Sequence, residues 1–175
     1  MAPSHDAERP PAEPVPEEPA YTGFSARLAI GIGGALLFPE GDTQLARPFF
    51  LVLDLGYAVT RNIAIVARGS SWLPTEDFSN EFFGAGAVYR FLAERLYVAG
   101  ALGLSLTRFG RAASEWRHYV QGLALEADVG QVFPLTTQTS FSLGAHFQFG
   151  TPILGKEPDA FMSLQAGIFV ALGLR

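Results

Sequence analysis

The stretch FMSLQAGIFVALGLR, residues 161–175, decides the fold. Its residues alternate strictly between two kinds. One parity is apolar throughout and consists of Met162, Leu164, Ala166, Ile168, Val170, Leu172 and Leu174. The other parity is small or polar, except for Phe161 at its start and Phe169. Because successive side chains of a strand point to opposite faces, this pattern predicts a strand with one purely apolar face.

The same pattern recurs along the chain. Eight segments show it, at about 22–38, 49–60, 63–73, 82–92, 96–109, 118–133, 140–151 and 161–175. Each is long enough for a tilted membrane-spanning strand of about 9 to 11 residues. The connections alternate between long and short, which places the long loops at one end and both termini at the short-turn end. An even-numbered antiparallel meander of this kind closes into a barrel and thereby loses its edges.

The two faces differ in a way that identifies the surrounding solvent. Within the expected strands, one face carries no Asp, Glu or Lys, and its single Arg, Arg108, lies at a loop end. The other face sets charged and polar residues among Gly, Ala and Ser. We call its charged and titratable members the lumen charge set: Arg27, Asp54, Arg68, Arg90, Glu126, Asp128 and His146. An apolar exterior around a polar interior predicts an all-β, eight-stranded, antiparallel up-and-down transmembrane barrel.

Aromatic residues support this assignment independently. On the apolar face they gather at two heights, as expected for side chains at the two membrane interfaces. The group near the short turns is Phe24, Tyr57, Tyr89, Phe91, Phe133 and Phe141. The group near the long loops is Phe38, Phe49, Phe83, Tyr119, Phe147 and Phe149. The expected partner of this face is a lipid bilayer or detergent.

Composition agrees with a membrane barrel. The chain is 49% hydrophobic and only 17% charged, against roughly 25% charged residues in ordinary soluble domains. No run of 18 consecutive apolar residues occurs, so a transmembrane helix is not expected. The chain contains no cysteine, which excludes disulfides and thiol chemistry.

Residues 1–21 differ from the rest. They are rich in proline and glutamate, carry most of the net charge of −5, and predict a disordered acidic tail ahead of the barrel at 22–175. The tail lacks the features of a secretion signal, so we expect Met1 to stand where a signal has been removed. The remaining residues are nearly neutral, and no nucleic-acid partner is expected.

At this point the chain resembles the small eight-stranded outer-membrane barrels of Gram-negative bacteria, the OmpA and OmpX type. The resemblance covers residues 22–175 and rests on pattern, strand count and loop asymmetry. It implies a Gram-negative outer-membrane location, periplasmic termini, assembly by the outer-membrane insertion machinery and a monomer. Such barrels usually end in Phe or Trp, whereas this chain stops at Arg175, so it is either trimmed or departs from the family pattern.

An enzyme is the first alternative. A lipid-modifying enzyme needs a Ser, a His and a carboxylate near the lipid-facing surface or a lipid-sized lumen. None of the three histidines, His5, His118 and His146, is expected beside a serine on the outer face. No HxxxH or HxH spacing indicates a metal site. We therefore expect no catalytic residue, no metal and no cofactor.

A narrow channel, or an uptake barrel of the OmpW type, is the second alternative. Eight strands leave an interior about wide enough for side chains alone. Near the long loops, however, several apolar residues are expected to point inward. These form the inward apolar group, Leu37, Phe50, Trp72, Phe82, Phe109 and Phe161, which predicts either a sealing cap or a vestibule for a small hydrophobic compound.

The sequence therefore favours a closed barrel with a structural or surface-interaction role, whose loops carry no evident ligand motif. It also predicts strand register. If Val59 and Ile63 close one turn, Asp54 lies opposite Arg68. If Phe133 pairs with Phe141, the same reasoning sets Asp128 opposite His146 and Glu126 opposite Gln148. A closed lumen network of matched charges is the interpretation that we carry forward, against separate hydrated charges in a wet lumen.

Overall fold

The computed structural model describes residues 23–38, 44–73, 78–112, 115–154 and 162–174. Residues 37, 44, 109–112, 115–120, 152–154 and 162 are described by their backbone alone. The predicted tail at 1–21 lies outside the described residues. In the described part of the chain, no helix is long and apolar enough to cross a membrane.

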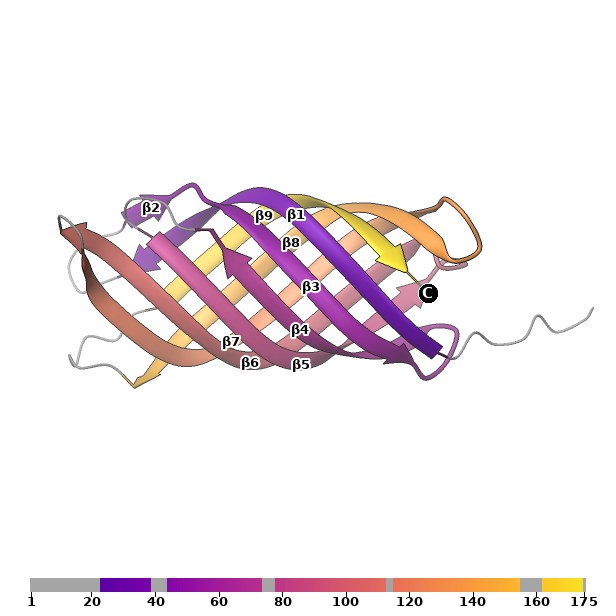
Figure 1. The fold of residues 1–175 in the computed structure, drawn as a ribbon, viewed down its shortest axis with the longest axis horizontal. Coiled ribbons are helices and arrows are strands. Elements are labelled where there is room, and N and C mark those ends of the chain that lie inside the picture. Colours follow the sequence, from indigo (N-terminus) through magenta and orange to yellow (C-terminus); the bar gives the residue numbers. More distant parts are fainter. Residues whose placement is uncertain (1–22, 39–43, 74–77, 113–114, 155–161, 175) are drawn as a thin grey trace, which may run out of the picture.

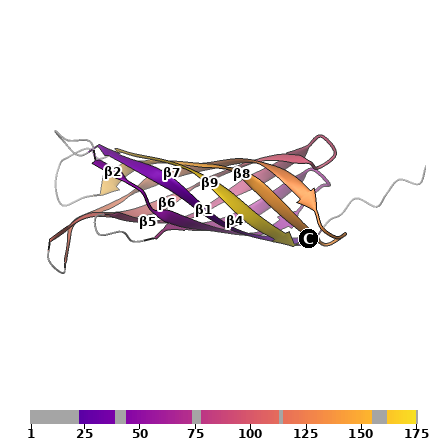
Figure 2. The ribbon, with the colours of Figure 1, turned by 90° about the horizontal axis from the view of Figure 1, so that it is seen from above.

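The described residues form a closed antiparallel barrel (Figure 1). The strands are β1 Gly23–Phe38, β2 Gln44–Ala46, β3 Phe49–Ala58, β4 Ile63–Trp72, β5 Phe78–Phe91, β6 Leu96–Ala112, β7 Glu115–Pro134, β8 Thr139–Leu154 and β9 Met162–Leu174. Neighbouring strands follow one another along the chain, and β1 pairs with β9 to close the wall. Seen from above, the strands remain tilted across the barrel axis (Figure 2).

Strands β2 and β3 together occupy one of the eight strand positions of the barrel wall. We call each such position a stave. Leu45 pairs with Leu36 and Phe49 pairs with Ile32, so both strands follow β1 in the same register. The interruption falls at Arg47 and Pro48, because proline has no N–H to donate to the ladder. Instead, the Pro48 carbonyl accepts a hydrogen bond from the Gly33 N–H at 3.2 Å. The eight-stranded prediction is thus confirmed, with one stave written as two strands.

The register predictions are confirmed as well. Asp54 pairs with Arg68, and the Val59 N–H bonds to the Ile63 carbonyl at 2.9 Å. Across β7 and β8, Asp128 pairs with His146. Two pairings of that hairpin, Phe133 with Phe141 and Glu126 with Gln148, also match the prediction. Each tight turn fixes the register of its hairpin, so one correct turn places every lumen-facing pair above it.

Four strands extend farther toward the long-loop end than predicted. Strand β5 begins at Phe78, β6 continues to Ala112, β7 begins at Glu115 and β8 continues to Leu154, so most of the segment expected as a loop at 110–117 is strand. The prediction was wrong here because apolar alternation requires lipid on one face. Beyond the bilayer both faces contact water, and a hydrogen-bonded ladder leaves no such pattern.

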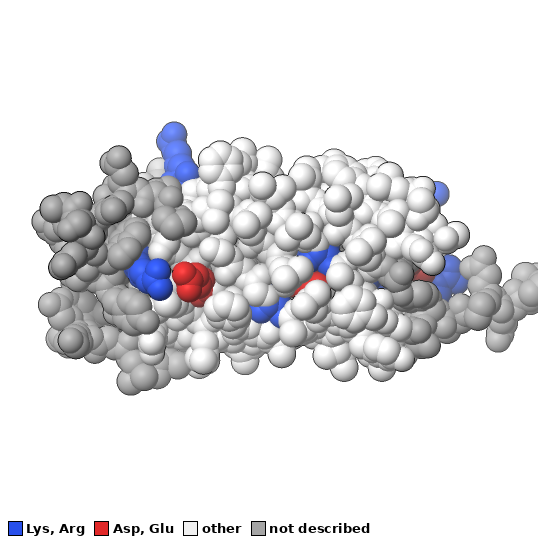
Figure 3. Space-filling model, in the orientation of Figure 1, with Lys and Arg blue, Asp and Glu red and all other residues white. Residues whose placement is uncertain are grey.

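The extension of β5 corrects a second expectation. Glu81 now lies within a strand and on its outward face, which was expected to lack carboxylates. Its Oε1 lies 3.6 Å from Nη1 of Arg108. Figure 3 shows charged side chains near both ends of this face and a small blue and red patch near its middle, with white surface between them. The Glu81–Arg108 pair therefore belongs to the edge of the apolar band rather than to its middle.

The turn between β5 and β6 is conformationally unusual. Leu92, Ala93 and Glu94 adopt φ values of 49°, 53° and 66°. This left-handed region costs a residue with a side chain about 1 kcal/mol or more relative to glycine. The Glu94 carboxylate accepts a hydrogen bond of 2.9 Å from Arg61 Nε, which ties this turn to the one between β3 and β4.

We expect Ala93→Gly to stabilise the barrel by about 1 kcal/mol, because glycine adopts positive φ without strain. The measurement is the free energy of unfolding in urea from lipid vesicles. Thr137→Gly is the control, since Thr137 lies in another short turn but has no positive φ. Equal effects of the two substitutions would contradict the strain argument.

Candidate functional site

The lumen charge set centres on Arg68 of β4. Its side chain is fully buried, and it donates to both oxygens of Asp54, at 2.6 Å from Nε and 2.9 Å from Nη2. The same Nη2 lies 2.9 Å from Oδ2 of Asp128, on the far side of the lumen. A guanidinium presents several donors in a fixed plane, so one arginine can hold two carboxylates from different strands.

Arg27 of β1 holds the same two carboxylates from the short-turn side. Its Nε donates to Asp54 at 2.8 Å, and its Nη2 donates to Asp128. The remaining Nη1 donates to the hydroxyl of Tyr97, over whose ring the guanidinium also lies, 5.1 Å from the centroid. A second ring, that of Phe169, lies 5.4 Å away. Two arginines and two aspartates thus form a ring of alternating charge across the lumen.

Glu126 and His146 extend the cluster toward the long loops. His146 Nδ1 lies 2.6 Å from Oδ1 of Asp128, and Ser70 donates its hydroxyl proton to Glu126. The other contacts of Glu126 are longer, at 3.9 Å both to Arg68 and to His146. All of these side chains are buried.

The structure places Arg90, the remaining member of the set, nearer the short-turn mouth. There it lines a cavity of about 50 Å³ together with Arg27, Asp54 and Tyr97. That volume holds only a few water molecules. This cavity is therefore small, and it lies at the short-turn end of the lumen.

An aromatic layer lies directly above the charges. The rings of Phe50 and Trp72 stack with centroids 4.6 Å apart, and Phe50 lies 4.9 Å from the His146 ring. Trp72 Nε1 donates to Gln148 at 3.0 Å, and Gln148 in turn donates to Asn80 at 2.8 Å. Of the inward apolar group, Phe50, Trp72 and Phe82 are fully buried. The side chains of Leu37 and Phe109 are not described, and Phe161 lies outside the described residues.

Two glycines make room for the aromatic layer. A Cβ added to Gly31 or to Gly167 would collide with the Phe50 ring. Gly31 is the cross-strand partner of Phe50 on the neighbouring strand β1, and Gly167 lies one strand farther along the wall, on β9. The narrow interior of an eight-stranded barrel admits a large ring only where the adjoining wall has no side chain.

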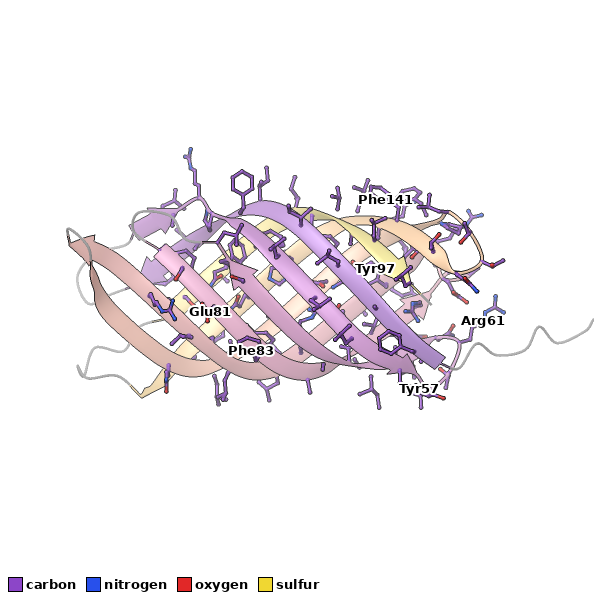
Figure 4. The ribbon with its side chains drawn as sticks, in the orientation of Figure 1. Tyr57, Arg61, Glu81, Phe83, Tyr97 and Phe141 are labelled. Atoms are coloured by element: carbon purple, nitrogen blue, oxygen red, sulfur yellow. The ribbon has the colours of Figure 1, made fainter. Side chains whose placement is uncertain are left out.

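On the outer face, the interface aromatics take the positions expected from parity. Tyr57 and Phe141 lie at the short-turn end, whereas Phe83 lies toward the long loops (Figure 4). Most of the twelve are exposed, as lipid-facing side chains must be, with Phe83 70% exposed. Phe91 and Phe141 are half-buried because each packs on a neighbouring ring. The side chain of Tyr119 is not described.

Several lumen residues were missed from the sequence. Tyr97 follows the parity of the lumen face and could have been found by extending that count to the strand end. Asn80, with its hydrogen bond of 2.7 Å to Thr107, was hidden because its segment was taken for a loop. Ser70 gave no signal beyond being a small residue on the lumen face.

The titratable side chains of the lumen are engaged with one another. Among the described residues, no group of three or more His, Asp or Glu is placed to hold a metal ion. His146 is completely buried between Asp128 and an aromatic ring.

Comparison with known proteins agrees with this fold. No protein-family model and no curated protein matched the sequence. Among solved structures, Neisserial surface protein A is similar with a TM-score of 0.65 and 15% identity, over 90% of this chain and 99% of that one. The attachment invasion locus protein Ail of Yersinia pestis is similar at 0.51 and 15%, over 86% of this chain and 99% of Ail. Its complex with the heparin analogue sucrose octasulfate gives 0.50 and 15%, over 85% and 99%.

These similarities establish a class. The chain has the fold of the small eight-stranded outer-membrane β-barrels, as the sequence pattern predicted. At 15% identity they carry no ligand or partner over to this chain.

We expect the Asp54–Arg68 pair to stabilise the barrel strongly. Asp54→Ala or Arg68→Ala leaves a buried charge without its partner, which costs about 3 to 5 kcal/mol. The double variant should cost less than the sum of the two, because it removes both charges together. The measurement is urea unfolding from lipid vesicles.

The control is the exposed Arg61–Glu94 pair, whose removal should cost less than about 1 kcal/mol. Strict additivity at Asp54 and Arg68 would show that the lumen charges are separately hydrated and not a network.

We expect Gly167→Ala to destabilise the barrel by about 1 to 3 kcal/mol, because the new methyl group displaces Phe50 or bends β9. Gly100→Ala is the matched control. It lies on the outward face of β6, and its Cβ would come no closer than 3.8 Å to the nearest atom. The measurement is thermal unfolding of the two variants in the same detergent. Similar losses of stability would contradict the conclusion that Gly167 leaves space for the Phe50 ring.

Proposed function

We propose that this protein is a non-conducting outer-membrane barrel with a structural or surface-interaction role, carried by the long-loop end. The supporting observation is a lumen blocked by two successive layers. Arg68, held by Asp54 and Asp128, forms the first layer. The stacked rings of Phe50 and Trp72 form the second.

The blocked lumen argues against the two channel readings. A solute would have to break an alternating ring of buried charges, and removing one partner from such a pair costs about 3 to 5 kcal/mol. It would then have to displace an aromatic layer that is fully buried. For the inward apolar group, the described members favour a cap over a vestibule.

The proposed orientation places the termini in the periplasm and the long loops outside the cell. Strand β1 starts and β9 ends at the same end of the barrel, where the short turns also lie (Figure 1). Small outer-membrane barrels have short periplasmic turns and longer extracellular loops. An interaction role then falls to the long-loop end, where β6 and β7 extend beyond the other strands. We assign the chain no enzymatic activity and no cofactor.

Two measurements test this proposal together. In planar bilayers we expect no ion conductance from the protein. Phe50→Ala combined with Trp72→Ala removes only the aromatic layer, so it should also give no current while the charge layer stays intact. Steady conductance by the unchanged protein, or passage of small hydrophobic compounds through it, would contradict the closed-lumen proposal.

Orientation is tested separately, using the absence of native cysteine. On intact cells, a membrane-impermeant maleimide should label Ser114→Cys, between β6 and β7, but not Thr137→Cys, in the turn between β7 and β8. The reverse pattern would place the long loops in the periplasm and refute a surface role.

A further inference from the structure

An arginine lies on the lipid-facing wall near the long-loop end. Because β2 and β3 share one register against β1, with Leu45 opposite Leu36 and Phe49 opposite Ile32, Arg47 falls opposite Gly34. Arg47 is exposed and has the outward parity of its two neighbours in this stave. A cation at this position lies just beyond Phe49, one of the interface aromatics, and hence at the height of lipid headgroups.

The wall beside Arg47 is hollowed. Gly34 pairs with Ala166 of β9, and Ala166 pairs with Phe147 of β8. Arg47, Gly34, Ala166 and Phe147 therefore lie at one height on four neighbouring staves. The two middle positions, Gly34 and Ala166, have small side chains or none. Larger side chains, Ile32 and its partner Ile168, rise on the side toward the membrane centre and are more than half exposed.

The resulting groove has a volume of about 670 Å³. Its lining residues are Ile32, Gly33, Arg47, Pro48, Phe49, Ala145, Phe147, Ala166, Gly167 and Ile168. Arg47 is the one charged residue among them. The groove is thus an apolar trough on the membrane face with a cation at its edge.

Two other arginines of the outer surface are each paired with a carboxylate. Arg61 is paired with Glu94 at 2.9 Å, and Arg108 is paired with Glu81 at 3.6 Å. Among the described residues, Arg47 has no carboxylate within ion-pair distance. An arginine at the membrane face needs an anion, and phosphate suits its planar fork of donors. Lipid headgroups supply phosphate at this height.

We propose that this groove binds a phosphorylated glycolipid of the surrounding leaflet, with a phosphate on Arg47 and an acyl chain lying over Gly34 and Ala166. The choice of a glycolipid rests on the orientation proposed above, which sets this end in the outer leaflet. A second copy of the chain suits the groove less well. The same face on a partner would bring a second Arg47 and, within the described lining, no carboxylate to meet it.

Native mass spectrometry of the full chain in detergent, with lipid A carrying both phosphates as the probe, tests this proposal. Arg47→Gln should weaken binding at least tenfold, and Ala166→Phe should do the same by filling the trough. Matched controls are Arg61→Gln, at the other end of the barrel, and Ala87→Phe, an outward alanine on β5; both should bind as the unchanged protein does. Circular dichroism confirms folding, and if Ala166→Phe does not fold, the exposed Arg47→Gln decides.

Three results would overturn the proposal. The first is unchanged binding in Arg47→Gln. The second is equal binding of dephosphorylated lipid A or of phosphatidylglycerol, which would remove the phosphate or the glycolipid from the site. The third is a stable dimer that Ala166→Phe disrupts, which would assign the groove to a second copy. None of these depends on conductance or on maleimide labelling, so this site and the proposed function can fail separately.

Discussion

Closure of the wall between β1 and β9 is the constraint on which the structure depends. Inside a bilayer no water is available to an unpaired N–H or C=O, so each backbone group must find its partner in the next strand. The pairing runs from Ala26–Leu174 to Phe38–Met162 and leaves no edge along the apolar band. The outward alternation of large apolar residues and the inward alternation of small ones both follow from this closure.

A closed barrel of eight staves has a narrow bore, and the bore explains the lumen chemistry. Buried charges are tolerated there only when they are matched, as Arg27 and Arg68 are by Asp54 and Asp128. Phe50 and Trp72 fill the section above, where Gly31 and Gly167 leave space. The matched charges and the close fit of the aromatic rings are thus both consequences of the narrow interior.

The sequence predicted the parts that lipid dictates. Alternation along 161–175 fixed the faces, and the turn closed by Val59 and Ile63 fixed the pairing of Asp54 with Arg68. It did not predict what depends on three-dimensional distance, such as Arg68 reaching Asp128 across the lumen. Nor did it predict strand beyond the bilayer, where Glu81 was taken for a loop residue because water on both faces removes the alternation.

The longest hairpin has a consequence for recognition. Strand β6 has 17 residues and β7 has 20. At a rise of about 3.3 Å per residue, β6 extends over about 55 Å along its own axis. Even when tilted, this exceeds an apolar band about 25 Å tall. Backbone pairing continues through this projection, with Arg111 opposite Trp116 near its tip. A molecule that docks on such a projection meets a preorganised ladder, and little conformational entropy is lost on binding.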